Sequence, residues 1–182
     1  VDDAVLSLRR SDLTGVVLDY RRPPLERSVV EREGRSYSRL SLAEHAGGNP
    51  AGHPDLPILT VLVGVPPQGE VYVTVDAEPW RTLDPATERV LPVALPLVSL
   101  PDGSDPPPGS QSWRPDPLIY GQRSWYGGEA ARVAELGWIR GQRVARVEIR
   151  PLQLSPADGR LRAMDQARVV LSFDAQEAPG AP

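Results

Sequence analysis

Several residue types are absent or scarce in this sequence of 182 residues. It holds no cysteine and no lysine, two histidines, one phenylalanine and one methionine. Without cysteine, the chain can form no disulfide, no thiolate metal site and no cysteine nucleophile of its own. Because lysine is missing, all 20 basic residues are arginines, and they are scattered along the chain rather than clustered.

The charge balance and the short apolar runs argue against two further classes of protein. The 24 acidic residues outnumber the 20 arginines, which leaves a net charge of −4. This charge argues against a general binder of polyanions, so we expect no nucleic-acid partner. The longest apolar stretches, such as Ile58 to Val65, are far shorter than the roughly 20 residues that a membrane-spanning helix needs. We therefore expect no membrane span.

Proline and glycine are abundant, with 21 and 16 residues. Long helices are expected to be scarce, because proline removes a backbone donor and glycine weakens helices. The combined share, about a fifth of the chain, stays below the roughly 25–30% that marks low-complexity disorder. The length suits one folded domain with a buried core.

Apolar and polar residues alternate with a period of two in several segments, as half-buried β-strands require. The clearest are residues 16–20, 71–76, 147–150 and 167–173. Turn signals separate such segments: Glu33-Gly34 lies between 25–32 and 35–42, and Ser155 to Gly159 forms a second hairpin turn. The sequence therefore predicts an all-β fold, an antiparallel two-sheet β-sandwich of jelly-roll-like type, with one short helix and a long Pro-rich loop.

The pattern also predicts where these parts lie. The domain is expected to span residues 1–174, and the small, polar, Pro-rich residues 175–182 to be a linker toward a downstream domain. The apolar segment 59–65 predicts a strand buried on both faces, joined through Pro66 to Gly69 to a hairpin partner at 70–77. A helical stripe predicts the short helix over 128–136, with Gly137 as its stop. Six prolines between 101 and 117 predict the exposed loop.

No set of residues points to catalysis or to a bound metal. His45 and His53 are the only histidines, and zinc requires three or four ligands. The acidic stretch Asp102 to Asp105 lacks the spacing of an EF-hand and its terminal glutamate. No Gly-x-Ser-x-Gly elbow occurs. We expect a chain without enzymatic activity, metal or cofactor.

Aromatic residues concentrate in one region and keep a second interpretation open. Trp113, Tyr120, Trp125, Tyr126 and Trp138 all lie between residues 113 and 138. Such a group is typical of a sugar-binding platform, and it also serves to cover one end of a sandwich. One interpretation of the sequence is therefore a free-standing β-sandwich module for adhesion or carbohydrate binding.

Two stretches carry an ordered set of prolines and glycines. In the first, a Gly-x-Pro-x-Leu-Pro segment precedes an apolar strand; in the second, an Arg-Gly pair precedes a strand, a Pro-x-Gln-x-x-Pro stretch and a hairpin glycine. The residues are Gly52, Pro54, Leu56 and Pro57, then Arg140, Gly141, Pro151, Pro156 and Gly159. In this order, over roughly residues 35–174, the chain resembles the N-terminal propeptides of gingipain-type cysteine peptidases. Leu154 departs from the family, which often carries an aromatic residue there.

The resemblance implies a non-catalytic β-sandwich that precedes a secreted Cys/His peptidase in the same polypeptide. Such a propeptide assists folding, docks on the catalytic domain of its cognate peptidase, keeps it latent by blocking the active site, and is removed by proteolysis. In the family, a propeptide loop presents a basic side chain to the specificity pocket. Arg114 and Arg123 are the candidates for an inhibitory loop here, because both lie in a long irregular segment and a guanidinium suits a carboxylate. Arg114 is the first choice, since Pro115 protects the bond that follows it.

Overall fold

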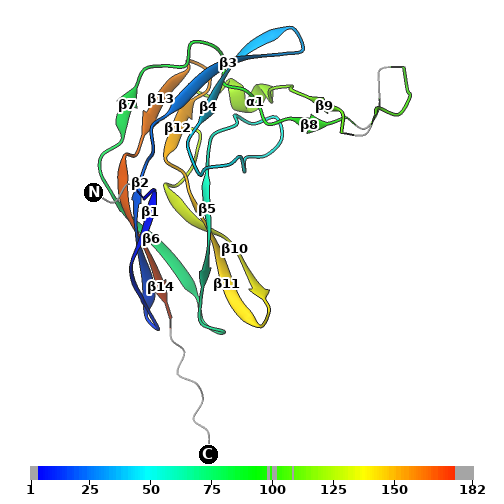
Figure 1. The fold of residues 1–182 in the computed structure, drawn as a ribbon. Coiled ribbons are helices and arrows are strands. Elements are labelled where there is room, and N and C mark those ends of the chain that lie inside the picture. The colour runs from blue at the N-terminus through cyan, green and yellow to red at the C-terminus, as the bar shows by residue number, and fades with distance from the viewer. Residues whose placement is uncertain (1–3, 98, 100–101, 108, 175–182) are drawn as a thin grey trace, which may run out of the picture.

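Two antiparallel sheets packed face to face form one half of the molecule (Figure 1). The structure is a computed structural model, and it describes residues 4–97, 99, 102–107 and 109–174. Strands take up 52% of the chain and helix 2%, which confirms the predicted all-β class. The four-stranded sheet has the order β1-β2-β14-β6 and the three-stranded sheet the order β10-β11-β5. The predicted linker 175–182 lies outside the described residues, as do residues 98, 100, 101 and 108 of the predicted Pro-rich loop.

The bounds of the elements follow the turns of the sequence. The strands of the four-stranded and three-stranded sheets are β1 Leu6–Asp12, β2 Gly15–Arg21, β14 Gln166–Phe173, β6 Val71–Ala77, β10 Ala131–Ile139, β11 Gln142–Ile149 and β5 Leu59–Gly64. The smaller elements are β3 Glu26–Arg32, β4 Arg35–Ser41, β7 Arg81–Leu83, β8 Leu95–Pro96, β9 Gln111–Ser112, β12 Leu152–Ser155, β13 Arg160–Ala163 and the helix α1 Pro117–Tyr120. No helix in the described part of the chain has the length and apolar character needed to cross a membrane.

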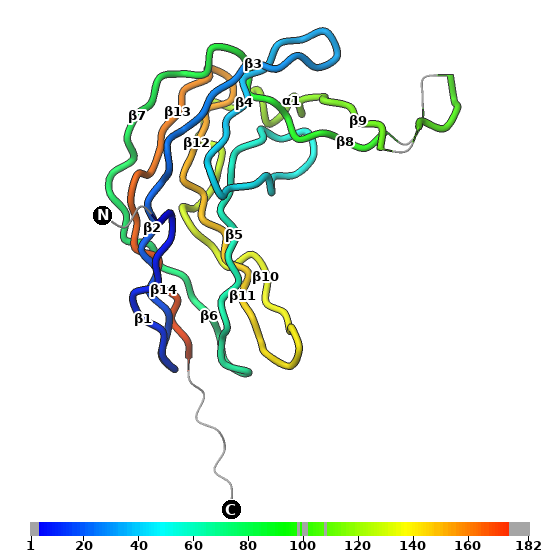
Figure 2. The backbone as a smooth tube through the Cα atoms, in the orientation of Figure 1, coloured from blue at the N-terminus to red at the C-terminus, as the bar shows by residue number. Residues whose placement is uncertain are grey.

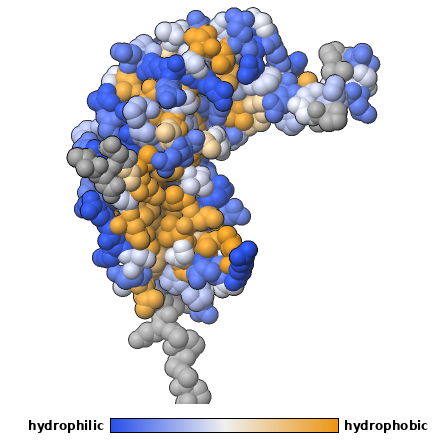
Figure 3. Space-filling model, viewed as in Figure 1, coloured by the Kyte–Doolittle hydropathy of each residue, from blue (hydrophilic) through white to orange (hydrophobic). Residues whose placement is uncertain are grey.

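The main core lies between the two larger sheets. Alternate residues of the central strands face inward and are fully buried, among them Val169 and Leu171 of β14 and Val147 and Ile149 of β11. The edges of the two sheets approach each other where β6 passes β10. Figure 3 shows a broad apolar area over the lower half of the face on which Figure 1 displays β1 and β5.

A second, smaller core fills the other half of the molecule. Here β12, β13 and β7 form one sheet and β3 pairs with β4. Leu40, Leu154 and Leu161 pack together in this half. Besides the longer segments after β4 and after α1, the chain passes between the halves in short breaks after β2, β6, β11 and β13 (Figure 2). Prolines stand in three of these breaks, where their missing N–H groups interrupt the ladders: Pro23, Pro24, Pro79 and Pro151.

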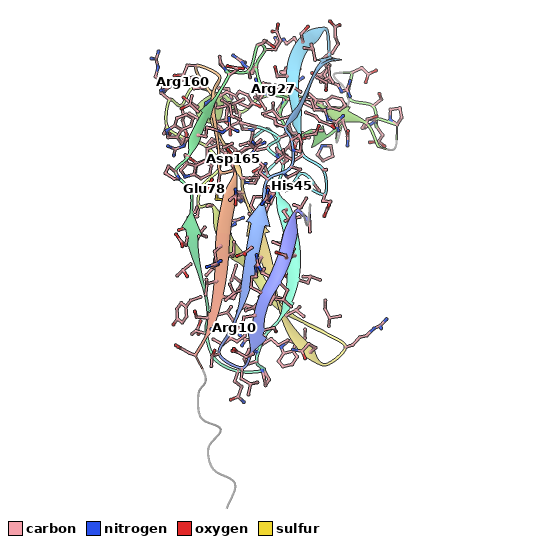
Figure 4. All side chains as sticks on the ribbon, turned by 60° about the vertical axis from the view of Figure 1, so that its left-hand side comes forward. Arg10, Arg27, His45, Glu78, Arg160 and Asp165 are labelled. Carbon is pink, nitrogen blue, oxygen red and sulfur yellow. The ribbon has the colours of Figure 1, made fainter. Side chains whose placement is uncertain are left out.

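The Asp165 carboxylate connects residues in or next to three of these breaks. Asp165, in the break between β13 and β14, lies mid-way along the molecule (Figure 4). Its Oδ1 accepts from Arg22 Nη2 at 2.6 Å, and its Oδ2 accepts from Arg81 Nε at 2.6 Å. Arg22 follows β2 and Arg81 begins β7, so the contacts join segments far apart in sequence. Hydrogen bonds from Arg81 and Arg22 lower the pKa of Asp165 below its usual value.

Substituting Asp165→Asn is expected to lower the free energy of unfolding by about 1–2 kcal/mol, because a charged acceptor shared by two guanidinium groups is lost. Urea unfolding followed by intrinsic fluorescence would measure the change. The matched control is Asp76→Asn, an exposed carboxylate of β6 with no hydrogen bond among the described residues, for which we expect a change within about 0.5 kcal/mol. Equal effects of the two substitutions would refute the role of Asp165.

The helix predicted over 128–136 is wrong, because β10 occupies most of that segment. β10 pairs with β11, and its register shifts between Val133 and Glu135. This bulge moves the inward positions from Val133 to Leu136, which lies opposite the buried Ala145. A spacing of three in a bulged strand therefore imitates the helical period. The short helix is instead α1, whose N-cap is Asp116 and whose first residue is a proline.

The hairpin expected between 59–65 and 70–77 is also wrong. β5 pairs with β11 and β6 pairs with β14, so the turn at Pro66 to Gly69 crosses from one sheet to the other. Burial of β5 on both faces is wrong as well, since Leu62 is 59% exposed. The hairpins β3–β4 and β12–β13 are confirmed, and both turns contain a glycine at positive φ.

Candidate functional site

A slender arm projects from the second half of the molecule (Figures 1 and 2). Its described residues are 95–97, 99, 102–107 and 109–112, with β8 and β9 paired at its base. The Leu97 N–H donates to the Ser110 carbonyl at 3.0 Å and continues this pairing. Within the arm, the Asp102 carboxylate accepts from the Ser104 hydroxyl and N–H, which lowers its pKa. The arm sequence contains no arginine, so the nearest basic residue is Arg114 at its base.

Arg114 is exposed on a segment whose backbone is held on both sides. The Tyr37 hydroxyl donates to the carbonyl of Trp113 at 3.4 Å. After Arg114, the Asp116 N–H donates to the Gly52 carbonyl at 2.9 Å, and the Asp116 carboxylate accepts from Leu118 N–H and caps α1. Within the described residues Arg114 pairs with no carboxylate. Because its backbone is fixed and its guanidinium pairs with no described carboxylate, Arg114 is suited to bind an acidic pocket of another protein.

Arg123 is exposed on the turn that follows α1. Its carbonyl accepts from Ser155 Oγ at 3.0 Å, and the neighbouring Gln122 carbonyl accepts from Ala157 N–H at 3.0 Å. Both bonds come from the β12–β13 turn, which Pro156 and Gly159 shape. The two candidate arginines thus flank α1, and α1 is anchored by Tyr120, whose hydroxyl donates to the Val90 carbonyl at 2.8 Å.

The structure brings Gly52 and the turn that contains Pro156 and Gly159 to this site, and it leaves Arg140 and Gly141 far from it. Gly52 has φ +78°, and a Cβ there would lie 3.3 Å from the Arg114 carbonyl. Pro54 is buried and bridges to Pro92. Arg140 and Gly141 instead form the turn of the β10–β11 hairpin. The remaining motif residues build the fold: Leu56 is buried, Pro57 enters β5, Pro151 interrupts β11–β12, and Pro156 and Gly159 shape the β12–β13 turn.

Gly141 lies in a tight hairpin turn, where it forms no bulge and no close backbone contact. Arg140 and Gly141 have φ values of 48° and 82°, so both residues adopt the left-handed conformation of a two-residue hairpin turn. A Cβ at Gly141 would meet nothing within 4 Å. The bulge of this hairpin lies further back along β10, between Val133 and Glu135.

A partly buried polar cluster connects the Gly52 loop to the site. The Tyr126 hydroxyl donates to Asn49 Oδ1 at 3.4 Å and lies 3.1 Å from His53 Nδ1. The Asn49 amide donates to the Leu56 carbonyl at 2.8 Å. Burial raises the pKa of Tyr126 to about 12. His45 lies elsewhere, with Nε2 2.9 Å from the Tyr20 hydroxyl. Among the residues that the structure describes, no three potential ligands gather where they could hold a metal.

The aromatic residues do not form one platform. The Arg32 guanidinium lies 5.1 Å from the ring centre of Trp113, and Arg162 lies 4.3 Å from that of Trp125. Tyr120 is buried, and Trp138 lies near the end of β10, beside the β10–β11 turn. A guanidinium group therefore lies against the ring of each of these two tryptophans, and the aromatic residues form no shared platform for a sugar.

Comparison with known proteins decides the family. The family model Propeptide_C25 matches residues 2–182. The chain belongs to this family. It is a non-catalytic propeptide, as the sequence predicted. A search of curated proteins finds no match.

Two solved structures have a similar fold. A structure that addresses the zymogenic latency of gingipain K from Porphyromonas gingivalis aligns with a TM-score of 0.79 and 18% identity, over 96% of this chain and 96% of that chain. The complex of the pro- and mature domains of RgpB from the same organism aligns with a TM-score of 0.73 and 18% identity, over 95% of this chain and 86% of that chain. At this identity the likeness establishes the fold of the propeptide.

Two features of the site, α1 and the contact between Gly52 and the Arg114 segment, were not predicted from the sequence. The segment between the two arginines was predicted to be irregular, whereas it contains α1. The signal was present in Asp116-Pro117, since aspartate is a favoured N-cap and proline a favoured first helical residue. The contact between Gly52 and the Arg114 segment joins positions more than 60 residues apart and carries no local signal.

Proposed function

We propose that this propeptide assists the folding of a gingipain-type cysteine peptidase and keeps it latent by docking on the catalytic domain and occupying its active site, until proteolysis removes the propeptide. The observation that carries the proposal is the fold match over 96% of both chains to a structure concerned with gingipain K latency. The RgpB complex supports docking, because a pro-domain of similar fold is present there together with its mature domain.

We assign the blocking contact to Arg114, with Arg123 as the second candidate. Both side chains are exposed, and both stand on backbone that is hydrogen-bonded to neighbouring loops. Because this backbone is already fixed in the free propeptide, less conformational entropy is lost on binding. Pro115 follows Arg114 and disfavours cleavage of the bond between them. The interface is expected to bury on the order of 1,600 Å², so one arginine contributes part of the affinity.

The proposal also covers the bounds of the docking domain, its linker and its secretion. Residues 1–174 are the docking domain, and 175–182 are the linker toward a peptidase that is translated after them. The Pro-rich, polar composition of this segment suits an extended linker that a protease can reach. The propeptide is secreted together with its peptidase, in line with its family.

Inhibition in trans tests this function. The peptidase domain encoded downstream is expressed, and its hydrolysis of a peptide substrate is measured with increasing amounts of the 182-residue chain. We expect tight, saturable inhibition. Substituting Arg114→Ala is expected to raise the inhibition constant at least tenfold, because a central arginine anchor typically contributes about 2 kcal/mol or more.

The matched control is Arg140→Ala, an exposed arginine in the β10–β11 turn, away from the arm. It is expected to leave the inhibition constant unchanged within about twofold. If Arg140→Ala weakens inhibition as much as Arg114→Ala, the assignment of the blocking contact is wrong. If the unaltered chain fails to inhibit an active peptidase, latency control itself is refuted.

A further inference from the structure

The two facing sheets differ by one strand. The four-stranded sheet ends at β1, and the three-stranded sheet ends at β5. On the opposite side, β6 and β10 approach each other and close the sandwich. Counting strands from that closed side, β1 faces a position beside β5 that no described strand occupies.

An apolar side chain marks this position. Leu8 of β1 lies opposite Leu18 of β2, and residues directly opposite in an antiparallel pair point to the same face. Leu18 is buried in the core at 6% exposure, whereas Leu8 is 63% exposed. Leu8 therefore faces the interior side of the sandwich with no strand above it. The apolar area in Figure 3 lies over this part of the molecule.

The free edge of β5 offers main-chain hydrogen bonds over a defined length. Ile58 exchanges both of its bonds with Ala46, so its backbone groups point away from β11. Because backbone groups alternate along a strand, those of Thr60, Leu62 and Gly64 point the same way. All three residues are exposed. The window ends at Pro66, which has no N–H to donate.

The β5 edge lacks the bulges and charged residues that β1 and β10 carry. β1 carries a bulge between Leu8 and Arg10 and several charged residues, and β10 carries a bulge as well. By contrast, residues 56–69 contain no charged residue at all. Bulges and charges discourage strand addition, so an uncharged, regular edge admits it.

We propose that the vacant position beside β5 takes up an extended segment of the cognate peptidase domain, which pairs with Thr60, Leu62 and Gly64 and covers Leu8 with an apolar side chain. This inference rests on the proposed function. Strand addition of this kind combines main-chain hydrogen bonds with alternating side-chain contacts. It gives the propeptide a second contact with the peptidase, separate from the arginines at the base of the arm.

Other occupants fit the position less well. A second copy paired edge to edge through β5 would bring its own four-stranded sheet beneath the same place, where its β2 would collide with β1. Residues 175–182 of this chain have two prolines and no alternating apolar residues, so they lack the pattern of a strand. A single extended segment from the peptidase meets neither obstacle.

Hydrogen exchange of the free propeptide and of its complex with the peptidase domain tests the proposal directly. The amides of Leu62 and Gly64 are expected to exchange at least tenfold more slowly in the complex. The amides of Val61 and Val63 serve as internal controls, because they already face β11 and pair with it in the free protein. Their exchange should change by a smaller factor.

Two substitutions at one position isolate the main-chain donor. Leu62→Pro removes an N–H that faces away from β11, and it is expected to raise the dissociation constant of the complex at least tenfold. Leu62→Thr keeps the N–H and the strand preference, and it is expected to change the constant less than threefold. Thermal unfolding of both variants confirms that the propeptide remains folded.

The outcomes separate this inference from the proposed function. If the propeptide inhibits the peptidase but Leu62 and Gly64 remain unprotected and Leu62→Pro inhibits equally well, strand addition is refuted and latency control stands. If no inhibition and no complex are found, both are refuted. Protection of the same amides in concentrated propeptide alone would show a second copy as the occupant and overturn the choice of the peptidase.

Discussion

Substituting Glu148→Gln is expected to lower the free energy of unfolding by about 3–5 kcal/mol at neutral pH, the range found when one partner of a buried ion pair is removed. The Glu148 side chain is 4% exposed near the C-terminal end of β11. Its carboxylate accepts hydrogen bonds from Arg132 Nε at 3.0 Å, Arg146 Nη1 at 3.0 Å and Arg150 Nη2 at 2.9 Å. Glutamine would turn an amide N–H₂ toward one of these donors.

The same substitution is expected to change the dependence of stability on pH. Burial raises the pKa of Glu148, but hydrogen bonds from Arg150 and Arg132 outweigh it, so the pKa of the folded carboxyl lies below its usual value of 4.5. A lowered folded pKa adds stability that is complete above the unfolded value and is lost as the pH falls through the folded value. The difference between the two proteins should therefore shrink below about pH 4.5.

Urea unfolding at pH 7 and at several lower pH values measures both effects. The control is Glu135→Gln, an exposed carboxylate 68% accessible that pairs with Arg146 at 3.4 Å. Exposed pairs contribute little, so we expect a change below about 1 kcal/mol at every pH. A Glu148→Gln protein as stable as the unaltered chain at pH 7 would show that the arginines do not require this carboxylate.

Substituting Gly15→Ala is expected to lower the free energy of unfolding by about 3 kcal/mol, near the upper end for overpacking. Gly15 begins β2 and pairs with Ser172 of β14. A Cβ there would overlap the carbonyl oxygen of Leu171 and lie 3.5 Å from the Ser172 Cα. Both atoms belong to the backbone of the central strand β14, so relief requires the two strands to separate.

Gly137→Ala is the matched control for this substitution. Gly137 also lies in a strand, and a Cβ there would meet nothing within 4 Å. We expect its stability to stay within about 0.5 kcal/mol of the unaltered chain, because alanine costs less conformational entropy than glycine. Thermal unfolding by circular dichroism compares the two variants. Similar losses in both would mean that backbone entropy, and not the contact with β14, decides the effect at Gly15.

The candidate site was only partly predictable from the sequence. The exposure of Arg114 and Arg123 followed from their place among prolines and turn residues. The support beneath them did not, because Gly52 and Ser155 reach the site from other parts of the chain. The aromatic residues did not predict a platform for a related reason. Trp113 and Trp125 lie only 12 residues apart in the sequence, but each packs on an arginine of a different strand.

The strands themselves were predictable where one face is buried, because burial imposes a period of two on the side chains. In Val71 to Asp76, the valines face the core and the polar residues face solvent as the alternation predicted. The period failed in β10, where the bulge after Val133 shifts the inward positions. A bulge is decided by pairing with another strand, and the local sequence does not contain that information.

The sequence by itself determined the all-β class, the tight hairpin turns, the absence of catalytic chemistry and the family, since each depends on composition, alternation or short ordered motifs. Only the tertiary structure decided which strands are neighbours. The apolar run before β6 predicts a strand, yet β5 pairs with β11, about 80 residues away. Packing between distant segments sets sheet order, and it thereby determines both the support of Arg114 and the vacant edge at β5.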